Sequence, residues 1–107
     1  MIRVIYDRAN YKVTVDGHAG SAERGRDLVC AAVSTLVMTL ASNAVHLVGT
    51  QCVKEHTIIV EEGKSVIKLS PVRKMRHVVL NTMDSICAGF EVLVGLCPEF
   101  ISYQVIR

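Results

Sequence analysis

The chain has 107 residues, which favours a single domain over residues 1–107 with a modest hydrophobic core. Its net charge of +2 is too mild to indicate nucleic-acid binding by itself, because phosphate binding requires clustered Lys and Arg. Half of the residues are hydrophobic and the mean hydropathy is +0.37. We therefore expect apolar surface to be covered by a second copy, most simply in a homodimer.

The four cysteines do not indicate a disulfide framework. The stretch MIRVIYDRANYKVTV alternates apolar and polar residues and lacks the apolar core of a signal peptide. We therefore expect a cytoplasmic protein with free thiols. Neither a C-x-x-C pair nor an H-x-x-x-H pair is present, so we expect no metal site.

Residues 2–17 predict a β-hairpin. Apolar residues alternate along IRVIY and again along YKVTV, and the turn DRAN lies between them. A loop, HAGSAERGR, follows this hairpin and leads to a helix from about Asp27 to Asn43, with Asp27 as its N-cap or first-turn residue. The stripe of this helix that should face the core contains Val29, Val33, Leu36 and Leu40.

The stretch 28–49 lacks Asp, Glu, Lys and Arg, so its length alone would suit a membrane span. We favour a buried helix of a soluble domain. The stretch contains polar residues, Asn43 and His46 among them, and strand patterns flank it on both sides.

The second half of the chain predicts another hairpin, another helix and a last strand. HTIIVEEGKSVIKL predicts a hairpin with its turn at Glu62-Gly63, and a basic connector follows. A second helix should run from about Lys74 to Gly95 and end before Pro98, and FISYQVI predicts a closing strand. The order ββαββαβ predicts an α+β fold, a mostly antiparallel sheet packed with two helices.

The stretch GHAGSAERGRDLVCAAVS (17–34) resembles the signature of the ribosomal-processing cysteine protease family, Prp. That signature is Gly-His-Ala-Gly, a flexible loop, and then Gly-x-Asp-Ile/Leu-Val-Cys-Ala-Ala-Val-Ser. Both halves are present here, and Cys30 follows His18 by 30 − 18 = 12 positions. The resemblance extends over essentially the whole chain and includes CPEFISYQV near its end. Ser21 and Cys97 stand where the family often has aromatic residues, a difference that bears on substrate preference.

The resemblance implies a homodimeric cysteine endopeptidase that removes the N-terminal extension of a large-subunit ribosomal protein. It places the nucleophile on Cys30 and the general base and acid on His18. The motif residues Asp27 and Ser34 become supporting or orienting residues. The loop and hinge glycines would be Gly17, Gly20 and Gly25. No cofactor is implied, and neither a membrane nor direct nucleic-acid binding is expected.

The residue types suit this chemistry by themselves. A Cys30 thiolate can attack a peptide carbonyl while His18 protonates the leaving amine. A helix N-terminus would favour the thiolate, and its free N–H groups could form an oxyanion hole. Asp27 would orient His18 or only bond backbone amides. The Ser34 hydroxyl would serve the site or bond the Cys30 carbonyl oxygen.

The glycine-rich loop between His18 and Cys30 should be mobile, so we expect the two side chains to lie too far apart for a hydrogen bond without substrate. We interpret the other cysteines as packing residues and the other histidines as surface residues: Cys52, Cys87, Cys97, His46, His56 and His77.

Two other functions stay open. One is a non-catalytic peptide-binding module on the same fold, associated with ribosomal protein maturation. The other is an RNA-binding factor that uses Arg73 and Lys74 of the basic connector. The intact pair of His18 and Cys30 favours the enzyme, because a pure binding module need not keep both residues.

Overall fold

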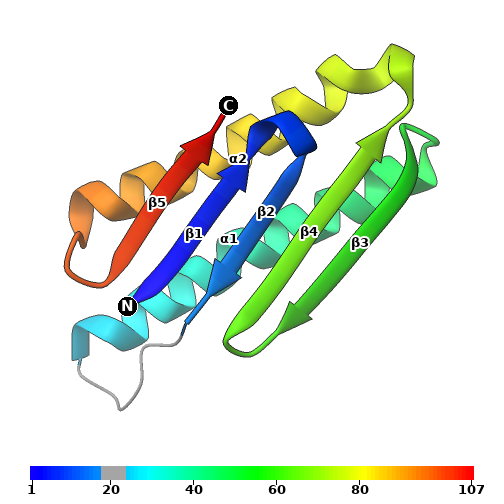
Figure 1. The fold of residues 1–107 in the computed structure, drawn as a ribbon. Coiled ribbons are helices and arrows are strands. Elements are labelled where there is room, and N and C mark those ends of the chain that lie inside the picture. The colour runs from blue at the N-terminus through cyan, green and yellow to red at the C-terminus, as the bar shows by residue number, and fades with distance from the viewer. Residues whose placement is uncertain (18–23) are drawn as a thin grey trace.

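The computed structural model describes residues 1–17 and 24–107 and shows one sheet backed by two helices (Figure 1). In chain order the elements are β1 (Ile2–Asp7), the 3-10 turn η1 (Arg8–Asn10), β2 (Lys12–Asp16), α1 (Arg24–Gly49), β3 (Val53–Glu61), β4 (Lys64–Pro71), the 3-10 turn η2 (Arg73–Met75), α2 (Arg76–Leu96) and β5 (Ile101–Ile106). This order confirms the predicted α+β class and the ββαββαβ arrangement.

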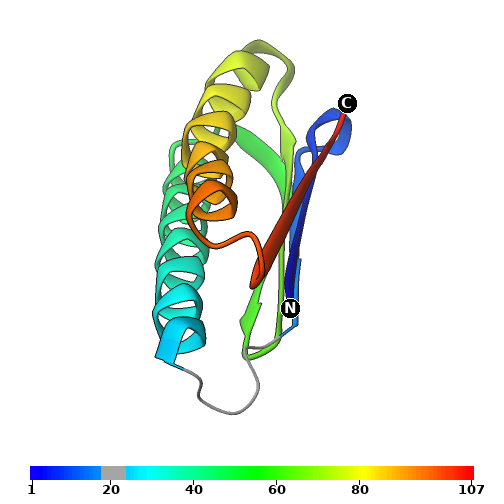
Figure 2. The same ribbon diagram turned by 90° about the vertical axis from the view of Figure 1, so that its left-hand side faces the viewer.

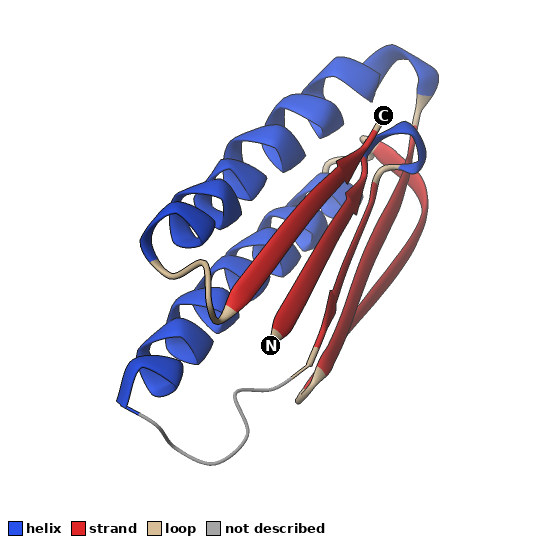
Figure 3. Cartoon of the chain, turned by 60° about the vertical axis from the view of Figure 1, so that its left-hand side comes forward, coloured by secondary structure: helices blue, strands red, loops and turns tan. Residues whose placement is uncertain are grey.

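The sheet has five strands in the order β3-β4-β2-β1-β5. Its neighbouring strands are antiparallel except β1 and β5, which are parallel. Both helices lie on the same face of the sheet, and the other face is open (Figure 2). The helices run side by side (Figure 3), with α1 against β3 and β4 and α2 against β5.

The helix-facing side of the sheet and the inner faces of both helices form one hydrophobic core. Of the predicted α1 stripe, Val29, Val33 and Leu40 are buried, and Leu36 is half-buried against the core. Leu36 lies over Gly89 of α2, where a Cβ atom would come within 2.5 Å of the Leu36 Cδ2. The missing side chain at Gly89 thus allows the two helices to approach closely.

Helix α1 is longer at both ends than the sequence predicted. It continues past Asn43 because its inner stripe continues, with Ala44 and Leu47 buried in the core. The Asn43 side chain donates from Nδ2 to the Thr39 carbonyl oxygen at 2.9 Å and does not end the helix. At its start, the helix includes Gly25, which we had predicted to be a loop or hinge residue.

Both helices are long and apolar enough to cross a membrane by length and composition. Here the inner face of each packs on the sheet, as in a core helix of a mixed domain. Their remaining surface still exposes large apolar side chains, namely Leu28, Met38, Val45, Val92 and Leu96. The apolar excess in the composition is therefore partly on the surface of this single chain.

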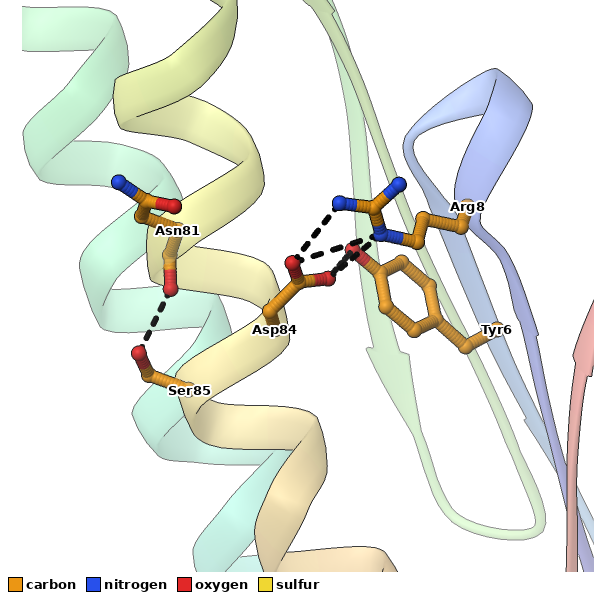
Figure 4. Close-up of polar contacts among 5 residues, drawn as sticks. All are labelled: Tyr6, Arg8, Asn81, Asp84 and Ser85. Atoms are coloured by element: carbon orange, nitrogen blue, oxygen red, sulfur yellow. Dashed lines mark hydrogen bonds and ion pairs between the residues drawn. The ribbon is translucent and has the colours of Figure 1, made fainter. Parts of the chain in front are cut away.

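A cluster of three polar side chains ties α2 to the β1 strand and the turn after it (Figure 4). The Asp84 carboxylate accepts a hydrogen bond from the Tyr6 hydroxyl at 2.7 Å and from Arg8 Nε at 3.0 Å. The hydrogen bonds from Arg8 hold the pKa of Asp84 below its ordinary value, while burial raises the pKa of Tyr6. Tyr6 therefore stays a donor and Asp84 an acceptor at neutral pH.

Candidate active site

Cys30 lies on α1, half-buried against the core. It lines a cavity of about 390 Å³ between α1 and the sheet. Val33 and Val37 of the same helix form one wall, and Val15 of β2 belongs to the other. The β3–β4 turn closes the cavity on a third side. The thiol thus borders a space that is mainly apolar and large enough for a side chain.

The β3–β4 turn, Glu62-Gly63, also holds the backbone just before the predicted catalytic histidine. The Gly63 carbonyl oxygen accepts a hydrogen bond from the Gly17 N–H at 3.0 Å. Gly17 has a φ of +105°, and a Cβ atom there would collide with the Met1 carbonyl oxygen. Only glycine suits this position, because an L side chain would add both backbone strain and a clash.

The structure does not describe every predicted site residue. His18 and Gly20 lie outside the described residues, so the predicted separation of His18 from Cys30 stays a prediction. The backbone of Asp27 belongs to α1, but the structure does not describe its side chain. The role of Asp27 in orienting His18 therefore also stays a prediction.

The observed start of α1 corrects two expectations about the helix end. Because the helix begins at Arg24, Asp27 is its fourth residue, in the first turn and not at the N-cap, and Cys30 is its seventh. At a rise of about 1.5 Å per residue, Cys30 lies about 9 Å along the axis from the first residue. The effect of a helix terminus on an anion fades within the first turn, and the free N–H groups belong to the first four residues. Neither the expected stabilisation of the thiolate nor the expected oxyanion hole is therefore supported at Cys30.

Ser34 lies one turn after Cys30, exposed, and lines the same cavity. Its neighbour Thr35 donates to the Ala31 carbonyl oxygen at 2.8 Å, as Thr39 does to Thr35 at 2.7 Å. Ser34 forms no such bond with any residue that the structure describes. Of the two roles considered for Ser34, the bond to the Cys30 carbonyl oxygen is therefore absent, and the hydroxyl is available to a ligand.

The other cysteines differ from Cys30 in their surroundings. All four are free thiols, but Cys52 and Cys87 are buried in the core, and Cys97 is half-buried against it. Burial raises the pKa of Cys87 to about 12. These positions agree with the packing role predicted for them. The exposed positions of His46, His56 and His77 likewise confirm them as surface residues.

Four polar residues of the cavity were missed by sequence reasoning: Glu61, Glu62, Lys64 and Ser65. The two carboxylates were assigned only to a hairpin end and its turn. Ser65 carried a signal, since it occupies a core-facing position in a strand whose other core-facing residues, Ile67 and Leu69, are apolar. That signal is a polar residue at a position where alternation predicts a hydrophobic one.

The basic run at the start of α2 belongs to another part of the surface. Arg73 and Arg76, with Lys54, line a separate cavity of about 360 Å³ that shares no lining residue with the Cys30 cavity. Lys74 is exposed beside them. The residues that would serve RNA binding thus do not contribute to the cavity that contains the cysteine.

Comparison with known proteins gives both a family and a fold. The family model described as "Cysteine protease Prp" matches residues 1–101. The crystal structure of SMU.848 from Streptococcus mutans is 30% identical, with a TM-score of 0.71 over 98% of this chain and 91% of that one. No curated protein matches the chain significantly.

Two structures of an essential ribosomal processing protease Prp from S. aureus have the same fold. One contains a covalently linked product peptide, with 19% identity and a TM-score of 0.66. The other contains a substrate peptide, with 18% identity and a TM-score of 0.68. Each comparison covers 97% of this chain and 96% of the other.

Proposed function

The chain belongs to the cysteine protease Prp family, and on that basis we propose that it is an endopeptidase that removes the N-terminal extension of a large-subunit ribosomal protein. The observation that carries the proposal is the half-buried Cys30 thiol at the edge of a cavity of about 390 Å³. The S. aureus protease of the same fold, whose two crystal structures contain a substrate peptide and a covalently linked product peptide, supports a peptide as the ligand.

The proposed reaction uses Cys30 as nucleophile and His18 as general base and acid. His18 takes the thiol proton as sulfur attacks the scissile carbonyl carbon, and a tetrahedral intermediate forms. The intermediate expels the amine, which takes the proton from His18, and leaves a thioester on Cys30. Water, deprotonated by His18, hydrolyses the thioester and restores the thiol. The reaction requires no cofactor.

Further residues would support this step. Asp27, within α1, would orient His18. Ser34, whose hydroxyl is available beside Cys30, would contact the substrate at the mouth of the cavity. We also propose that the protein acts in the cytoplasm as a homodimer, since the helices expose several large apolar side chains.

A cleavage assay tests the proposal. The purified protein is mixed with the precursor ribosomal protein of the same genome, and mass spectrometry follows the loss of the N-terminal extension. Cys30→Ala and His18→Ala should each lower kcat by about 10³-fold or more, because the two residues act as a unit. Cys97→Ala, at the other half-buried cysteine, is the matched control and should cleave normally.

The same assay separates the alternatives. Binding of the precursor by wild-type protein without cleavage would favour the non-catalytic peptide-binding module. Cleavage that survives Cys30→Ala would contradict the assignment of the nucleophile.

A further inference from the structure

Ser65 is the only buried polar residue in the part of the chain whose side chains the structure describes, residues 1–17 and 28–107. Its exposed fraction is 7%, and it lies on the helix-facing side of β4. The register places it between two valines, Val60 of β3 and Val15 of β2. An apolar side chain would therefore be expected at this position.

The Ser65 hydroxyl makes no hydrogen bond with any described residue. The Ser65 oxygen is nevertheless not among the buried side-chain atoms that lack a partner, of which the described residues contain one, Asp7 Oδ1, so the hydroxyl faces the cavity. A ligand that fills the cavity would separate this hydroxyl from water, and burying it without a hydrogen-bond partner would cost free energy. A ligand that offers a hydrogen-bond donor at this point would avoid that cost.

A ligand can reach the hydroxyl through the cavity that contains Cys30, because Ser65 lines this cavity. Between the two residues the walls are apolar, with Val33 and Val37 of α1 facing the sheet. The other polar side chains that line the cavity are those of Ser34, Glu61, Glu62 and Lys64. Glu61 and Glu62 are exposed and form no ion pair with a described residue. A side chain in the cavity would thus meet an apolar wall, the Ser65 hydroxyl and a rim that carries two carboxylates and one ammonium group.

We propose that Ser65 is a specificity-determining residue of this site. Its hydroxyl accepts a hydrogen bond from the tip of a substrate side chain that enters the cavity, while the valines contact the apolar stem. The chemistry indicates a long side chain with a donor at its end, either an amide of the glutamine type or an amine of the lysine type. The proposal rests on the proposed function, since it names the substrate class of that same site.

Such a site discriminates between substrate side chains by whether they pair with the Ser65 hydroxyl. A substrate side chain of the same length without a donor, such as methionine, would fill the cavity but would leave the Ser65 hydroxyl without a partner. We expect wild-type protein to prefer glutamine or lysine over methionine by about tenfold in kcat/KM, the effect of one hydrogen bond.

The test uses synthetic peptides that span the precursor's cleavage site. Each position beside the scissile bond is replaced in turn by Gln, Lys or Met, and kcat/KM is measured. At one position of the peptide, wild-type protein should prefer a side chain with a hydrogen-bond donor. Ser65→Ala should remove this preference, whereas Ser70→Ala should keep it. Ser70 is the matched control because it lies on the same strand and faces the open side of the sheet. The Gln and Lys arms distinguish an amide from an amine.

A stability measurement separates specificity from folding. Ser65→Ala should leave the midpoint of urea unfolding nearly unchanged, because the Ser65 hydroxyl makes no hydrogen bond with any described residue. A lower midpoint together with an equal loss of cleavage for every peptide would show a structural role and overturn the proposal. Unchanged preferences in Ser65→Ala would also overturn it.

A measurement of peptide binding distinguishes a failure of the role proposed for Ser65 from a failure of the proposed protease function. The peptides are titrated into Cys30→Ala and into Cys30→Ala/Ser65→Ala, with fluorescence anisotropy as the readout. If wild type does not cleave but the donor preference in binding depends on Ser65, the specificity role stands and the protease assignment fails. If wild type cleaves and neither binding nor cleavage depends on Ser65, the reverse holds. Binding of no peptide at all would overturn the specificity role.

Discussion

At the scale of single residues, Cys30 is separated from the other cysteines by its surroundings. Its thiol borders a cavity, whereas Cys52 and Cys87 are 6% and 1% exposed. The raised pKa of Cys87, about 12, also keeps that thiol protonated throughout the neutral range. Reactivity should follow these differences, because the thiolate is the attacking form and it must be accessible.

Alkylation with iodoacetamide at pH 7 tests this expectation. Cys30 should react first in the folded protein, Cys97 more slowly, and Cys52 and Cys87 only after unfolding, with peptide mass mapping at timed points as the measurement. A sample unfolded in urea, in which all four thiols should react alike, is the control. Equal rates for the four thiols in the folded protein would count against Cys30 as a nucleophile.

The two main residues of the cavity differ in how far the sequence could identify them. Cys30 belongs to a continuous motif, so its spacing from His18 was visible without any fold. Ser65 belongs to the site only because β4 pairs with β2 and β3 and because α1 crosses that part of the sheet. Neither the pairing register nor the placement of a helix follows from local pattern.

At the scale of elements, the contact of Asp84 with Tyr6 and Arg8 fixes α2 against the strand β1. Because the pKa of Asp84 is lowered by Arg8, the contact contributes stability at pH values above the ordinary carboxyl pKa of about 3.9. This contribution is lost as the pH falls through the lowered pKa of the folded protein. Asp84 and Arg8 are 38% and 35% exposed, so solvent screening limits its size.

Asp84→Asn should therefore lower the free energy of unfolding by about 1 kcal/mol at pH 7. The difference from wild type should shrink as the pH is lowered below 4, because the wild-type carboxyl is then increasingly protonated. Urea unfolding at a series of pH values measures this. Glu91→Gln, an exposed acid on the same helix, should have little effect. A deficit that stays constant down to pH 2 would contradict the role given to the charge.

Element types were predicted well, and the ends of α1 less well. The alternation of apolar and polar residues predicted the strands. The spacing of Val29, Val33 and Leu40 predicted the inner face of α1, where all three are buried. Asp27 and Asn43 are residue types that often end helices, but here tertiary packing prevails at one end: Leu47 is buried, so the helix continues to Gly49.

At the scale of the whole molecule, sequence could not give the strand order. The pairing of β1 with β5 joins Ile2 to Ile101, residues from opposite ends of the chain, and it is parallel where the local patterns only indicated hairpins. The connection through α2 makes this arrangement possible, since a helix can return the chain to the starting edge before the last strand begins. The one-sided sheet follows, because α1 and α2 lie on the same face.

The proposed homodimer is also tested at this scale. We expect light scattering after gel filtration to give twice the chain mass of 11.7 kDa. Val45→Glu combined with Val92→Glu, at two positions each 61% exposed on α1 and α2, should shift the protein toward monomer, because charge would enter an apolar interface. Ile59→Glu on β3, which is 42% exposed, is the control. A wild-type monomer at every concentration would exclude the dimer.

The contact between Gly17 and Met1 has a practical consequence for purification. Ile2 lines the Cys30 cavity, so residues fused ahead of Met1 would begin near its mouth. Because β1 and β5 are parallel, Arg107 lies at the far end of the sheet (Figure 1). An affinity tag ahead of Met1 would place a loose peptide beside the thiol, where it would act as a tethered competitor at high local concentration. A tag after Arg107 leaves the cavity clear.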